Sequence, residues 1–114
     1  MIYTSYFAKQ KYNKSENLYA ITYYKPPFFK GKYLECVAPS GDLVQNYKKG
    51  LIGQKKYQTL YIKYLEQHKE EIVKEIETLP DGSILLCYEG PGKFCHRHVL
   101  AECLRSWGYE CEEI

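Results

Sequence analysis

The sequence SILLCYEGPGKFCHR, residues 83–97, decides the fold class. Its first half is an almost unbroken apolar run that ends at Glu89. Such a run predicts a strand buried on both faces, at the centre of a mainly parallel sheet. The glycines and the proline of residues 90–93 cannot continue a strand in a sheet interior, and they predict a loop. Residues 95–107 then favour a helix, and a buried strand followed at once by a helix is typical of an α/β protein.

The apolar spacing of this helix predicts how it is oriented. Its buried face consists of four residues at three- and four-residue steps: Leu100, Cys103, Leu104 and Trp107. His96 lies one turn earlier and should point inward over the strand ends, whereas Arg97 lies on the flank of the buried face. His98 falls on the opposite side and should face solvent.

Similar patterns elsewhere complete the predicted fold. Three further strands are predicted: residues 2–7, 18–23 and 109–113. A short helix capped by Ser40 or Asp42 should end before Gly50, and an amphipathic helix should cover residues 54–78. The chain, residues 1–114, therefore predicts one α/β domain, a three-layer sandwich with a small, mainly parallel sheet of about four strands.

Composition and charge exclude several classes of protein. The net charge of +2, with lysine and glutamate interspersed, argues against binding to duplex nucleic acid. No apolar run approaches the ~20 residues that span a membrane, and no signal-peptide pattern opens the chain. The five cysteines are odd in number, so we expect reduced thiols and a cytoplasmic location.

The predicted site lies where the central strand ends and the next helix begins. Ligands of open α/β sheets bind outside the carboxyl ends of the strands, and a helix N-terminus offers free N–H groups to an anion. Arg97 would bind the anion, and Cys95 is either an activated nucleophile or a small residue beneath Phe94. We expect His96 and Glu89 to act beside Cys95, with Glu89 as a general base or as the ion-pair partner of Arg97.

The sequence does not predict a metal site. Five possible ligands lie close together: Cys87, Cys95, His96, His98 and Cys103. No two of these cysteines are separated by the two-residue gap typical of zinc sites, and His98 should face outward. We therefore expect neither a metal nor a cofactor.

An ordered series of motifs runs through nearly the whole chain. It comprises Thr4-Ser5-Tyr6, Ala38-Pro39-Ser40, Tyr47, Gly50, Tyr57, Tyr61, Leu85-Leu86-Cys87-Tyr88-Glu89, Cys95-His96-Arg97, Leu100 and Leu104. This series resembles the family called domain of unknown function 488, many of whose members are small cytosolic proteins of bacteria and phages. The resemblance implies a compact α/β fold but no defined activity. The site that it implies consists of Glu89, Cys95, His96 and Arg97, with Thr4 and Ser5 from a neighbouring strand end.

Three functions are compatible with these observations. The first is binding of, or a reaction on, a small anionic ligand such as a nucleotide derivative. Tyrosines, Tyr6 and Tyr61 among the thirteen, would then stack on the base. The second is a thiol enzyme similar to the rhodaneses, in which a strand also leads into a cysteine-bearing loop and a helix. The third is a non-enzymatic interaction module that uses exposed tyrosines and the loop Pro27-Phe28-Phe29.

Overall fold

The computed structural model describes residues 1–90 and 92–114, so the predicted loop over residues 90–93 lies partly outside the described residues. In the described residues, the chain forms a sheet of five strands in the order β3-β2-β4-β1-β5, and every neighbouring pair is parallel. The strands are β1 (Ile2–Tyr6), β2 (Leu18–Ala20), β3 (Lys32–Tyr33), β4 (Ile84–Cys87) and β5 (Cys111–Glu113).

The predicted central strand is confirmed. All four residues of β4 are buried, and Leu85 lies opposite Thr4 of β1 on one side and opposite Tyr19 of β2 on the other. The α/β class and the small parallel sheet are confirmed as well. The sheet has one strand more than the predicted number, because β3 lies in a segment that carries no readable strand pattern. Its two residues are too few to show an alternation.

Five helical segments accompany the sheet in the part of the chain that the structure describes: η1 (Glu35–Val37), α1 (Gly41–Lys48), α2 (Gln54–Gln67), α3 (Lys69–Glu77) and α4 (His96–Ser106). The side chain of Ser40 accepts a hydrogen bond from the N–H of Leu43 at 3.2 Å and so caps α1, as predicted. Gly50 follows that helix with a φ of 75°. Within the described residues, no helix combines the length and the apolar character needed to cross a membrane.

The single helix predicted over residues 54–78 is wrong, because the structure divides it at His68. This residue has φ −108° and ψ 17°, which ends α2 and begins α3. Leu65 before the break and Ile72 after it are both fully buried. The apolar spacing therefore continues across the break, and a pattern of burial alone does not reveal it.

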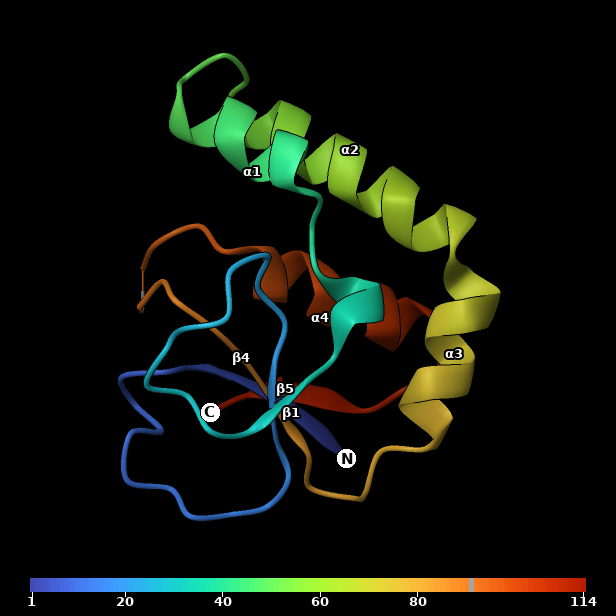
Figure 1. Ribbon diagram of the computed structural model, residues 1–114. Coiled ribbons are helices and arrows are strands. Elements are labelled where there is room, and N and C mark those ends of the chain that lie inside the picture. The colour runs from blue at the N-terminus through green and yellow to red at the C-terminus, as the bar shows by residue number, and fades with distance from the viewer. Residues whose placement is uncertain (91) are drawn as a thin grey trace.

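The two faces of the sheet are covered differently. The connections from β3 to β4 and from β4 to β5 run in one direction across the sheet and carry the helices, with α4 packed on the strands and α2 packed on α4 (Figure 1). The connections from β1 to β2 and from β2 to β3 run in the opposite direction and contain no helix in the described residues. Since parallel crossovers are right-handed, opposite directions place them on opposite faces. There Phe7 and Phe29 of these connections pack on Leu18 and Leu86.

Candidate functional site

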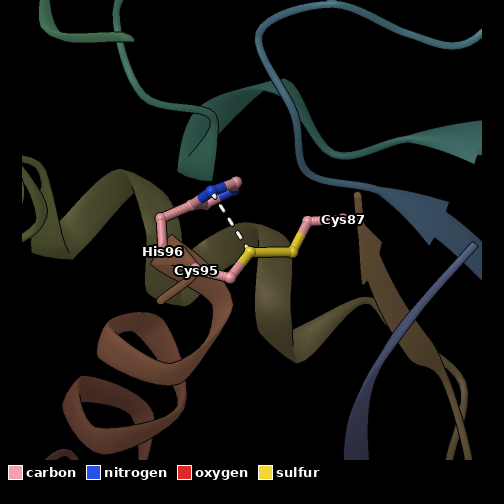
Figure 2. Close-up of side chains that lie close together, drawn as sticks. All are labelled: Cys87, Cys95 and His96. Atoms are coloured by element: carbon pink, nitrogen blue, oxygen red, sulfur yellow. Dashed lines mark hydrogen bonds between the residues drawn. A yellow bond between two sulfur atoms is a disulfide. The ribbon is translucent and has the colours of Figure 1, made fainter. Parts of the chain in front are cut away.

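Cys87 and Cys95 are joined at the carboxyl edge of the sheet. Cys87 is the last residue of β4, Cys95 directly precedes α4, and their sulfur atoms form a disulfide (Figure 2). The expectation that all five cysteines are free thiols is therefore wrong for this pair. Within the described residues, Cys36, Cys103 and Cys111 are free. The fold explains the pairing, because α4 packs back onto β4 and brings the start of the helix over the end of the strand.

His96 points inward from the first turn of α4, as predicted, and is only 8% exposed. Its Nε2 lies 2.7 Å from the carbonyl oxygen of Ile21, which only accepts, so Nε2 carries the proton and donates it. Burial lowers the pKa of His96 to about 4, so the imidazole is neutral at pH 7. Its other nitrogen, Nδ1, lies 3.9 Å from Sγ of Cys95 (Figure 2). His98 is exposed, as predicted.

Tyr61 stands beside His96. Its ring is fully buried and meets the imidazole edge-on, with the ring centres 5.6 Å apart. Burial raises the pKa of the Tyr61 hydroxyl, which therefore stays protonated and donates to the carbonyl of Val37 at 2.6 Å. Tyr61 thus supports His96, and its predicted role in ligand binding stays a prediction.

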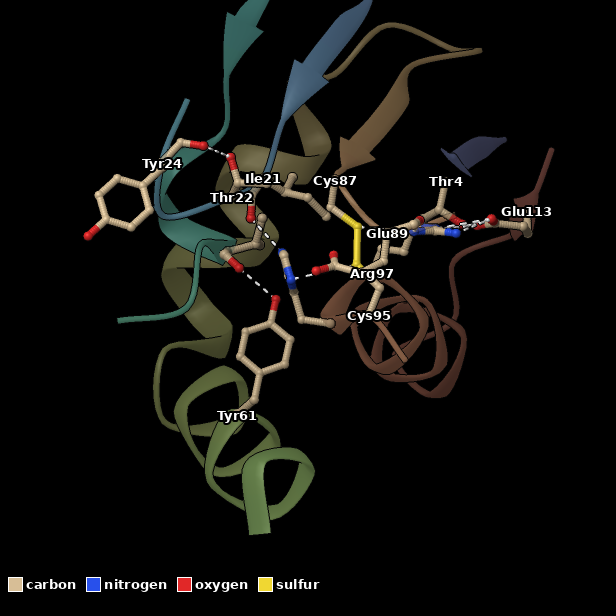
Figure 3. The surroundings of a disulfide bond; sticks show 12 residues. Thr4, Ile21, Thr22, Tyr24, Tyr61, Cys87, Glu89, Cys95, Arg97 and Glu113 are labelled. Carbon is tan, nitrogen blue, oxygen red and sulfur yellow. Dashed lines mark hydrogen bonds and ion pairs between the residues drawn. A yellow bond between two sulfur atoms is a disulfide. The ribbon is translucent and has the colours of Figure 1, made fainter. Parts of the chain in front are cut away.

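Arg97 is fully buried and is held from several sides (Figure 3). Its Nε donates to the carboxylate of Glu113 at 3.0 and 3.1 Å. Nη2 lies 2.9 Å from the same carboxylate, as an ion pair without hydrogen-bond alignment. Nη1 donates to Sγ of Cys87 at 3.1 Å and to the backbone carbonyl of Glu89. The ring of Tyr6 lies 5.5 Å from the centre of the guanidinium. The carboxylate partner of Arg97 is therefore Glu113, not Glu89.

Thr4 and Ser5 belong to the same buried group. Thr4 donates to the carboxylate of Glu113 at 2.6 Å, and Ser5 donates to the carbonyl of Ile114 at 3.0 Å. Burial alone would raise the pKa of Glu113, but hydrogen bonds from Arg97 and Thr4 and the charge of Arg97 hold it below its usual 4.5. The charge of Arg97 is thus neutralised inside the protein. The predicted roles of Arg97, Thr4, Ser5 and Tyr6 in ligand binding stay predictions.

A separate cavity of about 120 Å³ opens beside Cys95 and His96. Six aromatic residues line it: Tyr23, Tyr24, Tyr47, Tyr57, Tyr88 and Phe94. Lys48 at the end of α1 and Glu89 after β4 add a cation and a carboxylate, both on exposed side chains. The Nζ of Lys48 lies 5.8 Å from the ring centre of Tyr24. The three predicted catalytic residues, Glu89, Cys95 and His96, therefore all line this cavity.

The aromatic lining depends on a glycine that sequence reasoning did not single out. A Cβ atom on Gly41, the first residue of α1, would stand 2.7 Å from the ring of Tyr23. A side chain at position 41 would therefore push the half-exposed ring of Tyr23 away from the helix. The ring centres of Tyr23 and Tyr24 are 4.6 Å apart. The hydroxyl of Tyr24 accepts a hydrogen bond from the side-chain amide of Gln45 at 3.0 Å. The high tyrosine count was the one sequence signal of this lining.

A second and larger hollow lies elsewhere, on the loop-covered face of the sheet. Its volume is about 560 Å³, and four lysines line it: Lys11, Lys14, Lys30 and Lys32. Phe28, which is 67% exposed, stands at the same hollow. The loop Pro27-Phe28-Phe29 therefore lies apart from the cavity beside Cys95.

Residues 6–108 match the model of a family described as the active DUF488-N3 subclade. No curated protein and no solved structure matches the chain.

Proposed function

We propose that this chain, which belongs to the DUF488 family, binds a small anionic ligand with an aromatic ring, such as a nucleotide derivative, in the cavity beside Cys95 and His96. The observation that carries the proposal is the lining of six aromatic residues together with one lysine. Aromatic side chains stack on the face of a base, and a base bound in this way contributes about 1–3 kcal/mol.

The size of the cavity decides which part of the ligand it holds. Drug-sized ligands occupy roughly 300–1,000 Å³, whereas this cavity measures about 120 Å³. The ring of the ligand enters it, and the remainder lies at the mouth. Tyr23, Tyr24 and Tyr88 are each about half exposed, so that each keeps one surface free for stacking.

The charged groups at the mouth orient the ligand. Lys48 is exposed and serves the anionic group, because a lysine pairs with phosphate as a point charge. The first turn of α4 adds N–H groups, and Cys95 gives that helix no side-chain cap. The carboxylate of Glu89 accepts from a ring N–H, and if the ligand reacts, Glu89 is the general base. Cys95 becomes a nucleophile only after the disulfide is reduced.

Titration calorimetry with three probes tests this proposal: a nucleoside monophosphate, the matching nucleoside and inorganic phosphate. We expect the monophosphate to bind most tightly. Lys48→Gln should weaken its binding about tenfold, equivalent to ~1.4 kcal/mol, and leave nucleoside binding unchanged. Tyr24→Ala should weaken both. If none of the three probes binds, the proposal is wrong.

Lys32→Gln is the matched control, because Lys32 is also exposed but lines the larger hollow on the other face. It should leave all three affinities unchanged. Should Lys32→Gln weaken binding while Lys48→Gln does not, the ligand sits in the lysine-lined hollow. That outcome would favour the interaction module that uses Phe28.

A further inference from the structure

We propose that Cys87, Cys95 and His96 together bind one Zn²⁺ ion when the disulfide is reduced. The two Sγ atoms and one imidazole nitrogen all lie within 4.8 Å of one another, and all three residues are buried (Figure 2). Zinc takes thiolate and imidazole ligands at about 2.3 and 2.0–2.1 Å, so ligand atoms around one ion lie less than ~4.6 Å apart. The three side chains therefore need only small movements to meet at one ion.

His96 is already arranged as a metal ligand. Histidines that bind metals use one ring nitrogen and donate from the other to a carboxylate or a backbone carbonyl, which fixes the tautomer. Here Nε2 donates to the carbonyl of Ile21 at 2.7 Å, and the unprotonated Nδ1 lies on the side of Cys95 Sγ. The imidazole also forms a T-shaped pair with the ring of Tyr61, so that it is held on two sides.

Charge balance favours zinc at this buried place. Two thiolates and one neutral imidazole carry a charge of −2, which one Zn²⁺ cancels. Arg97 adds no net charge, because Glu113 neutralises it (Figure 3). The Nη1 of Arg97 lies 3.1 Å from Sγ of Cys87 and would donate to that sulfur as a thiolate. A buried site without net charge avoids the large cost of burying an ion.

The backbone leaves room for the two sulfur atoms to separate. The Cα atoms of Cys87 and Cys95 are 7.4 Å apart, compared with about 4.4–6.8 Å in most disulfides. A dithiol reductant supplies two electrons and two protons, which convert the disulfide into two thiols while the reductant becomes a disulfide. Zn²⁺ then displaces the two thiol protons. Because Cys95 and His96 line the cavity, the fourth coordination position of the zinc ion faces the cavity.

Sequence spacing concealed this site. Zinc motifs are recognised by cysteines two to four residues apart, whereas Cys87 and Cys95 are separated by eight positions. The return of α4 over β4 brings them together in space. The zinc proposal is independent of the proposed binding of a nucleotide derivative, since metal binding is measured on the protein alone.

Titration with Co²⁺ and Zn²⁺ tests the site on the full chain. The protein is reduced with a phosphine, freed of metal and titrated with Co²⁺ without oxygen. We expect one Co²⁺ per chain with a thiolate-to-cobalt charge-transfer absorption, and Zn²⁺ should displace it. The oxidised protein should give no such band. A reduced protein that binds no Co²⁺ or Zn²⁺ would overturn the proposal, as would equal binding by the oxidised protein.

Variants and thiol mapping locate the ion. Cys95→Ser should abolish the charge-transfer band or weaken Co²⁺ binding by more than ~100-fold. Loss of a residue that only supports a metal ligand through a hydrogen bond costs ~10–100-fold in metal affinity. Cys103→Ser is the matched control, because Cys103 is a buried free thiol on the same helix, and it should leave binding unchanged. If Cys95→Ser does not fold, alkylation of the wild type decides. Because Cys87 and Cys95 are buried, their alkylation rates are compared in the reduced protein with and without zinc. Zinc should slow the alkylation of both and leave that of Cys36 unchanged, and equal rates for Cys87 and Cys95 with and without zinc would refute the assignment.

Discussion

Replacement of Glu113 by glutamine tests the buried ion pair at the edge of the site. Glu113→Gln keeps the shape of the side chain and one acceptor oxygen but removes the charge that compensates Arg97. The guanidinium of Arg97 is 0% exposed, whereas the carboxylate side of the pair is 37% exposed. We expect a loss of folding free energy, because a charge without access to water is left without its partner.

The magnitude follows from this asymmetry. Removal of one partner from a fully buried pair costs about 3–5 kcal/mol. Water reaches the carboxylate end of this pair, and the glutamine oxygen still accepts from Arg97 and Thr4, so we reduce the expected loss to about 2–3 kcal/mol. For a domain of this size, 1 kcal/mol corresponds to roughly 4 °C in Tm. The variant should therefore melt about 8–12 °C below the wild type.

Thermal and urea unfolding, followed by circular dichroism at pH 7, measure this difference. Glu112→Gln is the matched control, because Glu112 is the exposed neighbour on the same strand. It should change the stability by less than ~0.5 kcal/mol. If the two variants lose the same amount of stability, Glu113 is an ordinary surface carboxylate and the reasoning is wrong.

Two further predictions concern the groups around the site. The depressed pKa of Glu113 means that its stabilisation is present above pH 4.5 and is lost as pH falls below that value. Urea unfolding of the wild type and Glu113→Gln should therefore differ at pH 7 and converge in acid, and a constant difference would contradict this. Tyr61→Phe should cost about 1–3 kcal/mol, because it leaves the buried carbonyl of Val37 without a donor. The hydroxyl of Tyr64 donates to the carbonyl of Cys36 at a partly exposed position. Tyr64→Phe should therefore lose less folding free energy than Tyr61→Phe in the same urea unfolding experiment.

The local parts of the fold could be predicted from the sequence. Each of these parts depends on a pattern within a few residues. The apolar run predicts β4, the glycines predict the loop after it, and the apolar stripe predicts α4. The cap at Ser40 is equally local. The break at His68 could not be predicted, because the buried residues of α2 and α3 follow one helical spacing across it. Such errors arise where the periodicity continues although the backbone changes direction.

The candidate site was predictable only in part, for a different reason. Helical spacing oriented His96 and His98 correctly, because that information lies within one helix. The partner of Arg97 comes from β5, and the disulfide joins a strand end to a helix start. Such contacts depend on the order of strands in the sheet. Lys48 also lines the cavity through the packing of distant segments, and the sequence around Lys48 carries no motif that indicates this position.

The position of the first strand has a consequence for synthesis on the ribosome. β1 lies between β4 and β5, so that Tyr3 pairs with Ile84 and with Glu112. A chain that emerges from its amino end therefore presents its first strand about 80 residues before either partner exists. Parallel pairing at such separations closes large loops and is slow, and an unpaired strand edge is prone to aggregation. The sheet is complete only once β5 has left the ribosome, and until then one edge of β1 or both edges stay unpaired.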